Sequence, residues 1–321
     1  MFRLRAKPLL PVFALGLLAA QDTVIRVDVK LVQVVATVKN RAGDLVGNLQ
    51  KSDFELYDNG VRQEIADLNR QTDQPVSIAL LIDTSGSTNK ELKYETDSAL
   101  KFLHAVFADS HPEDAVALYT FNYEVTEQKG FTHSLPALEA KLKMIHGEAG
   151  TAVYDAIFFA AQGLEGRTGR KVIVIVTDGG DTFSRYTLRQ ALEATQLADA
   201  VIYPIVVLPI TNDAGRNVGG ENALTFLAEG TGGRTFLPAI GVALDHAFAD
   251  ILREIRTQYV LGFYPRDVPI TKDRFHKLEV RVKTPDLKVS ARNGYYGEAE
   301  VSTPGARISV TPERKKNLQE K

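Results

Sequence analysis

The chain has 321 residues, 44% of them apolar, and it contains no cysteine. A chain of this size can bury one large or two modest hydrophobic cores, and without cysteine it has no disulfides, thiolate metal sites or lipid-anchored N-terminal cysteine. The formal net charge of −2 argues against general binding to nucleic acid or to anionic membrane surfaces.

The N-terminal segment differs from the rest in composition. MFRLRAK carries three basic residues and no acid, and an apolar run from Pro8 to Ala20 follows. This predicts a secretory signal peptide over residues 1–20, because the run is shorter than the ~20 apolar residues that span a bilayer. Leu18 makes the cleavage site imperfect, and an uncleaved anchor is the alternative. Cleavage would leave 35 basic and 40 acidic residues, a net charge of −5.

Since no other apolar run approaches spanning length, we expect a protein that is secreted, periplasmic or on the cell surface and is not inserted in a membrane.

Residues 21–72 have the patterns of β-strands. Ile25 to Leu31 alternate between apolar and charged residues, the period of a half-buried strand. Asn59-Gly60 between FELY and VRQEI predicts a two-residue hairpin turn. Arg70 to Pro75 read as a linker.

Strands alternate with helices over residues 76–257. VSIALLID, from Val76, is a continuous apolar run typical of a strand covered on both faces. Such alternation predicts an α/β fold with a doubly wound, mostly parallel, Rossmann-like sheet. We expect further strands at 114–121, 171–177, 201–208 and 233–238, and helices at 90–108, 134–145, 152–165, 187–200, 222–230 and 242–258.

The C-terminal part returns to β patterns. Three alternating strands are expected at 258–265, 276–283 and 288–296, and Pro265 and Pro285 lie between them. Neither these strands nor those of residues 21–72 cover their apolar faces alone, so we expect residues 258–298 and 21–72 to form one β-sandwich. Residues 299–321 are charged and poor in apolar groups, which predicts a disordered tail.

Oxygen-bearing side chains gather where the predicted parallel strands end. Asp83 closes the first strand, Ser85 and Ser87 follow it, Asp178 closes VIVIVT, and Thr151 precedes a helix. Loops at the carboxyl ends of such strands converge on one crevice. Carboxylates and hydroxyls suit a hard cation, for which Mg²⁺ is the first choice and Mn²⁺ or Ca²⁺ the alternatives.

The motifs DTSGS, GTA and TDGGD, in this order, resemble a von Willebrand factor type A (vWA) domain with a metal-ion-dependent adhesion site, over residues 76–257. The resemblance implies that Ser85 and Ser87 bind the metal directly and that Asp83 and Asp178 act largely through water. Thr151 would change between direct and bridged contact, and a partner's Asp or Glu would complete the shell. The flanking strands resemble the bacterial secreted VWFA-related family.

We therefore expect a non-enzymatic, metal-dependent adhesion module of unspecified oligomeric state. One alternative is a phosphatase similar to the haloacid dehalogenases with Asp83 as the nucleophile, although Ser85 stands where that family has a second acid. Another is a structural envelope protein with a vestigial metal site. Ser87 and Thr151 could also be simple helix caps and Asp178 a turn residue.

Overall fold

The structure is a computed structural model that describes residues 31–70, 74–86, 92–108, 110–147, 150–207, 217–269 and 274–297. Lys30–Ala299 form one compact unit. The predicted signal peptide, the C-terminal tail and all but the last residue of the strand expected at Ile25–Leu31 lie outside the described residues.

The centre of the α/β part is a sheet with the strand order β7-β6-β5-β8-β9. Its parallel strands are β5 (Val76–Asp83), β6 (Ala115–Phe121), β8 (Arg170–Thr177) and β9 (Ala200–Val206). Every residue of β5 is buried, as expected for an apolar strand with helices on both of its faces. The predicted α/β fold with a mostly parallel sheet is therefore confirmed.

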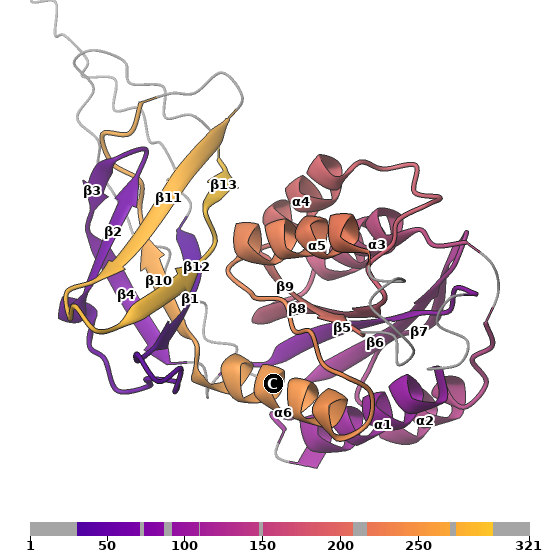
Figure 1. The fold of residues 1–321 in the computed structure, drawn as a ribbon. Coiled ribbons are helices and arrows are strands. Elements are labelled where there is room, and N and C mark those ends of the chain that lie inside the picture. The colour runs from indigo at the N-terminus through magenta and orange to yellow at the C-terminus, as the bar shows by residue number, and fades with distance from the viewer. Residues whose placement is uncertain are drawn as a thin grey trace, which may run out of the picture. The chain divides into compact units, whose positions relative to one another are not determined.

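Helices cover both faces of this sheet (Figure 1). On one face lie α1 (Leu92–Ala108), α2 (Leu135–Leu142) and α6 (Val242–Thr257). On the other lie α3 (Val153–Glu165), α4 (Leu188–Leu197) and α5 (Val218–Thr231). Alternate residues of each strand serve the two cores: Leu80 packs in the first and Leu81 in the second. Both faces of the sheet are thus buried under helices.

Two segments at the edges of the sheet differ from the sequence-based expectation. Val125–Thr132, for which no element was expected, form β7, an antiparallel partner of β6 with an irregular register. The strand expected at 233–238 is wrong, because only Phe236 pairs with β9. Its amide donates to the Pro204 carbonyl at 2.8 Å. Pro238, which has no N–H, soon follows and cannot extend the ladder.

The remaining strands form two antiparallel sheets, with the orders β12-β1-β10-β4 and β13-β11-β2-β3. Both sheets contribute to one core that includes Val34, Leu56, Tyr259 and Val280. The strands of the first sheet are β1 (Val32–Lys39), β4 (Ile65–Arg70), β10 (Tyr259–Phe263) and β12 (Lys288–Ala291). Those of the second are β2 (Phe54–Asp58), β3 (Val61–Gln63), β11 (Phe275–Val282) and β13 (Gly294–Tyr296), and a short 3-10 helix (Lys51–Asp53) precedes β2.

The single strand expected at 288–296 is in fact two strands, β12 and β13. β12 pairs with β1, whereas β13 pairs with β11. The chain therefore crosses from one sheet to the other at Arg292 and Asn293, which the alternating sequence does not reveal. The predicted hairpin between β2 and β3 is confirmed: Asp58 pairs with Val61, and Asn59 and Gly60 have φ angles of +47° and +82°, as a type I′ turn requires.

The α/β part is inserted between two paired strands of the first antiparallel sheet. Arg70, at the end of β4, is the partner of Tyr259, at the start of β10. Only Gln258 separates α6 from β10, and its side-chain amide donates to the hydroxyl of Tyr203 in β9 at 2.7 Å. The chain thus leaves and re-enters the sandwich at neighbouring positions.

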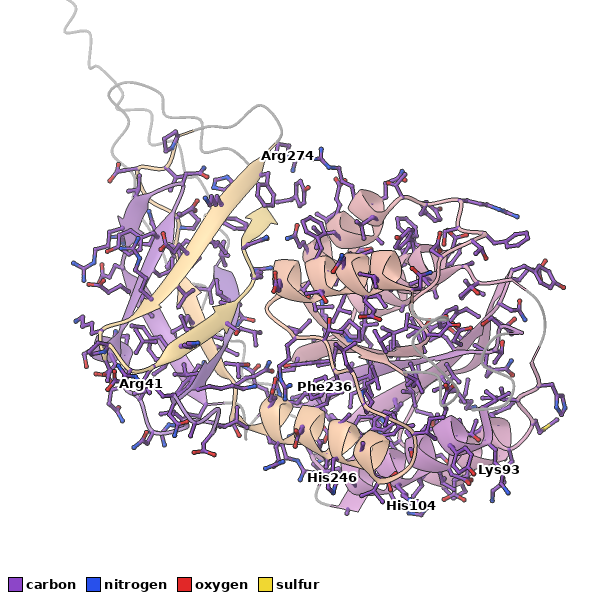
Figure 2. The ribbon with its side chains drawn as sticks, in the orientation of Figure 1. Arg41, Lys93, His104, Phe236, His246 and Arg274 are labelled. Atoms are coloured by element: carbon purple, nitrogen blue, oxygen red, sulfur yellow. The ribbon has the colours of Figure 1, made fainter. Side chains whose placement is uncertain are left out.

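The histidines do not gather. His104 and His246 lie on the exposed faces of α1 and α6 (Figure 2). His276 is buried in the sandwich, where its Nδ1 lies 3.0 Å from Oδ1 of Asp58. The Tyr295 hydroxyl donates to Oδ2 of the same carboxylate at 2.7 Å. This buried cluster joins β2, β11 and β13.

Candidate functional site

Strand order brings the two predicted aspartates to one edge of the sheet. β5 and β8 are parallel neighbours, with Ile82 opposite Val176. Asp83 is the last residue of β5, and Asp178 follows β8 directly. Parallel neighbours end at the same edge, so the two carboxylates lie near each other. The negative charge of Asp178 accordingly helps to raise the pKa of Asp83.

Asp83 is fully buried and both of its oxygens accept hydrogen bonds. Oδ1 accepts from the amide of Ser85 at 2.8 Å, and Oδ2 accepts from the hydroxyl of Thr177 at 2.6 Å. Burial raises the pKa of Asp83 to about 7, against the hydrogen bonds from Thr177 and Ser85. A buried carboxylate of this kind is stabilised in its charged form by a nearby cation.

The turn after Asp83 is fixed to the neighbouring strand. The amide and hydroxyl of Thr84 both donate to the carbonyl of Phe121, at 2.8 and 3.1 Å. Ser85 is 1% exposed. Its amide bonds to the Asp83 carboxylate, and its predicted role as a metal ligand stays a prediction. Ser87 lies outside the described residues, so its predicted role stays a prediction.

Thr151 is attached to the loop that carries Asp178. Its carbonyl accepts from the amides of Thr182 and Phe183 at 2.8 and 3.0 Å, and its amide donates to the Thr182 hydroxyl at 3.1 Å. The residue is 6% exposed. These bonds hold the start of α3 against the loop between β8 and α4, so Thr151 joins the edge where Asp83 and Asp178 lie.

Side chains of the loop between β8 and α4 cap the start of α3. Sequence reasoning did not assign them this role. The N-cap residue, Ala152, makes no side-chain capping bond. Oδ1 of Asp181 accepts instead from the amide of Val153 at 2.8 Å, and the Ser184 hydroxyl accepts from the amide of Tyr154 at 3.0 Å. Asp155 in return accepts from two amides of the loop. Asp181 therefore positions the Thr151 segment.

The start of α5 packs closely against the turn after β8. A Cβ at Gly220 would lie 1.5 Å from the carbonyl oxygen of Gly179, so only glycine fits there. Asn217 caps the helix, accepting from the Gly220 amide at 2.8 Å. Gly179 has φ +91°, the left-handed region that glycine occupies without strain. This close packing fixes the backbone that directly follows Asp178.

Exposed aromatic side chains lie beside the site. Tyr123 and Phe183 are 48% and 60% exposed. They flank Gly150, where an added Cβ would meet Cβ of Tyr123 and Cδ2 of Phe183 at 3.0 Å each. Gly150 precedes Thr151, so this aromatic pair borders the candidate metal ligands. Aromatic side chains in such a position are typical of binding surfaces.

The donor set at this edge fits a hard cation. The side chains offer two carboxylates and the hydroxyls of Ser85 and Thr151, and oxygen is the ligand atom that Mg²⁺ and Ca²⁺ prefer. Within the described ranges, no group of three or more His, Cys, Asp or Glu side chains is placed to hold a metal. Hydroxyls would therefore have to complete the ligand set.

Residues 78–180 match a family model described as the von Willebrand factor type A domain. The matched segment contains Asp83, Ser85, Ser87, Thr151 and Asp178.

A comparison with curated protein sequences finds no match. In the described part of the chain, no helix has both the length and the apolar character needed to cross a bilayer.

Solved structures with a similar fold come from several bacteria. Conserved hypothetical protein BatB from Bacteroides thetaiotaomicron is 16% identical, with a TM-score of 0.45, over 56% of this chain and 98% of that one. The vWF domain of the type V pili tip protein Mfa5 from Porphyromonas gingivalis is 14% identical, with a TM-score of 0.49, over 57% and 95%. The pilus adhesin SpaC from Lactobacillus rhamnosus GG is 10% identical, with a TM-score of 0.46, over 75% and 47%. With TM-scores below 0.5, these likenesses say nothing of this chain's ligand.

Proposed function

We propose that this chain is a protein-binding module that uses a divalent cation, Mg²⁺ first, to hold an Asp or Glu of a partner protein. The cation would be held by Asp83, Ser85, Ser87, Thr151 and Asp178. When bound, Mg²⁺ supplies an open coordination position for a carboxylate oxygen. The chain's own residues fix the ligand geometry and form the surrounding surface.

The observation that carries this proposal is the environment of Asp83. Its carboxylate is fully buried beside a second acid, and burial raises its pKa to about 7. A bound cation would offset both the burial and the repulsion from Asp178. The match of residues 78–180 to the vWA family model supports the same assignment.

The geometry favours binding over phosphoryl transfer. A nucleophilic aspartate needs an accessible oxygen, but both oxygens of Asp83 accept hydrogen bonds and its side chain is fully buried. Lys171, the lysine that precedes Asp178 on β8, lies at the opposite end of that strand and donates to the carbonyl of Glu165, so it is not beside the two carboxylates. We therefore propose a non-enzymatic role, in the secreted or cell-surface location expected from residues 1–20.

Calorimetric titration of Mg²⁺ and Mn²⁺ into the metal-free protein tests the metal site. Wild type should bind one ion, and Asp178→Ala should bind none. Asp178 is the better position for this test because it is partly exposed, whereas the buried Asp83 also supports the fold. Asp286→Ala removes a surface carboxylate that pairs with Arg41, so it is the matched control and should bind like wild type.

Two results would contradict the proposal. One is a wild type that binds neither ion, in the absence and in the presence of a short Asp-containing peptide. The other is equal binding by wild type and Asp178→Ala. Metal binding without any Mg²⁺-dependent capture of acidic peptides would leave a structural cation site and remove the adhesion role.

A further inference from the structure

A small cavity with two buried arginines lies in the compact unit, away from the candidate metal site. It is lined by residues of β1 and β10 and by the starts of β8 and β9, among them Gln33, Gln74, Arg170, Asp199, Val260 and Arg292. About 30 Å³ is open to the centre of a water-sized sphere. Since one water needs roughly 10–15 Å³, the space suits one or two waters or one small ion.

Arg170, the first residue of β8, lines this cavity. Its side chain is buried at 8% exposure, and its terminal nitrogens donate to the carbonyls of Ile255 and Gln74. Among the residues that the structure describes, its Nε has no hydrogen-bond partner. Carbonyls accept hydrogen bonds but carry no net charge, so neither of these two bonds neutralises the guanidinium charge of Arg170.

Arg292 lines the same cavity from the crossing between β12 and β13. It is 7% exposed; one terminal nitrogen donates to Oδ1 of Asp199 and the other to the carbonyl of Gln33. Its Nε, like that of Arg170, is buried and finds no partner in the described part of the chain. Buried donors without an acceptor are rare and costly.

The described side chains that line the cavity carry more positive than negative charge. Among the described residues that line it, two guanidinium groups face one carboxylate, and Asp199 is bonded to Arg292. Burial lowers the pKa of Arg170 to about 10; the charge of Asp114 acts in the opposite direction, and the charge of Arg256 adds to the lowering. A water could satisfy the two Nε–H groups but would not offset the excess positive charge.

We propose that this cavity binds one small monovalent inorganic anion of the size of chloride. The two Nε–H groups are the donors that remain for it, and charge-assisted hydrogen bonds of this kind are the stronger class. The anion would join the first antiparallel sheet to the starts of β8 and β9. It would thereby stabilise the attachment of the inserted α/β part, independently of any metal at Asp83.

The first test is a crystal structure of the protein grown in sodium bromide, with data collected at the bromine absorption edge. An anomalous peak in the cavity, within hydrogen-bonding distance of both Nε atoms, is the expected result. Ordinary water density without an anomalous peak would overturn the proposal. This test needs no variant, so it does not depend on whether an altered cavity still folds.

The second test is thermal unfolding in solution. Chloride replaces gluconate, an anion too large for the cavity, at constant ionic strength. The melting temperature of wild type should rise and saturate at or below physiological chloride concentration. Arg292→Lys and Arg170→Lys keep the charge but remove the Nε–H, so each should weaken the apparent chloride affinity about tenfold or more.

The matched control is Arg281→Lys, because Arg281 is an exposed arginine on β11 that pairs with Glu279. It should respond to chloride like wild type. If the cavity variants also respond like wild type, chloride acts elsewhere. If bromide enters the crystal but unfolding shows no saturation, the anion is adventitious and the proposal fails.

Discussion

The hydroxyl of Thr177, the last residue of β8, donates a 2.6 Å hydrogen bond to Oδ2 of Asp83, the last residue of β5. The same hydroxyl accepts from the amide of Gly179 at 3.1 Å. One side chain therefore fixes both the buried carboxylate and the turn that presents Asp178. The sequence pattern assigned Thr177 no role, yet it connects the two acids of the candidate site.

Thr177→Val should destabilise the protein by ~1.5–3 kcal/mol, since it removes a hydrogen bond to a buried carboxylate while it keeps the side-chain shape. Urea unfolding without metal measures this free energy, and calorimetry should show weaker Mg²⁺ binding. Thr126→Val, at an exposed position on β7, is the control and should change neither quantity. Unchanged stability of Thr177→Val would mean that the hydrogen bond contributes nothing.

The metal-free protein should become less stable as the pH rises from about 4 to about 7. Burial raises the pKa of Asp83 from 3.8 to about 7, so in this window the folded state holds a proton that the unfolded state has released. Each pKa unit corresponds to roughly 1.4 kcal/mol, which gives an upper bound of ~4 kcal/mol. Unfolding of wild type and Asp83→Asn at several pH values measures the effect, and the slope in this window should be smaller in Asp83→Asn.

Asp181→Ala should lower stability by ~0.5–2 kcal/mol, the usual effect of losing a helix cap. It should also weaken Mg²⁺ binding, because Asp181 holds the start of α3 and hence Thr151 in place. Ser184→Ala removes the second acceptor of the same cap. The double variant should cost less than the sum of the two, since the Ser184 hydroxyl also donates to Asp181; strict additivity would show that the two caps act separately.

Gly220→Ala should disturb the site through packing alone. The new Cβ would overlap the carbonyl of Gly179, so the start of α5 must move away from the Asp178 turn, at a cost of ~1–3 kcal/mol or more. Gly219→Ala is the matched control one residue away, where the nearest atom would be 3.5 Å from the added Cβ. It should be neutral or slightly stabilising. Similar behaviour of the two variants in thermal unfolding would refute the close approach.

Phe183→Ser should weaken partner binding and leave Mg²⁺ binding intact, because the backbone amide of Phe183, and not its ring, bonds to Thr151. A phage-displayed random peptide library selected in Mg²⁺ and eluted with EDTA provides the probe. Wild type should enrich peptides in which Asp or Glu neighbours an apolar residue, and Phe183→Ser should bind them about tenfold more weakly. Leu197→Ser, an exposed apolar position at the C-terminal end of α4, should bind them like wild type.

Local patterns predicted the elements whose residues lie on buried faces. The apolar run of β5 indicated a strand covered on both faces, and Asn59-Gly60 indicated its turn, because each depends on neighbours in sequence. β7 was missed because its pairing with β6 is irregular and blurs the alternation. The break between β12 and β13 depends on which strands pair, and the strand pattern alone does not contain that information.

The same distinction applies to the candidate site. The placement of Asp83 and Asp178 at one edge of the sheet could be predicted, because Asp83 ends β5 and Asp178 follows its parallel neighbour β8. The role of Asp181 could not, since the helix it caps begins 28 residues earlier in the chain. The need for glycine at position 220 likewise could not be predicted, because it depends on the approach of α5 to the turn after β8, which is distant in sequence. Sequence reasoning found the proposed ligands and missed the residues that hold them in place.

The insertion of the α/β part between β4 and β10 also decides the order in which the chain can fold during synthesis. Among the described strands, β1 pairs with β10 and β12, and β4 pairs with β10. Within residues 31–70, β1 makes an isolated bridge from Lys39 to Leu45. Until Tyr259 has been synthesised, the hairpin of β2 and β3 is the one pair of described sandwich strands that can form, and an isolated hairpin is marginally stable. The edges of β1 and β4 therefore stay unpaired until the inserted α/β part has folded and β10 can pair with them. Refolding should accordingly be slow, and protease should cut residues 31–70 first in any partly folded intermediate.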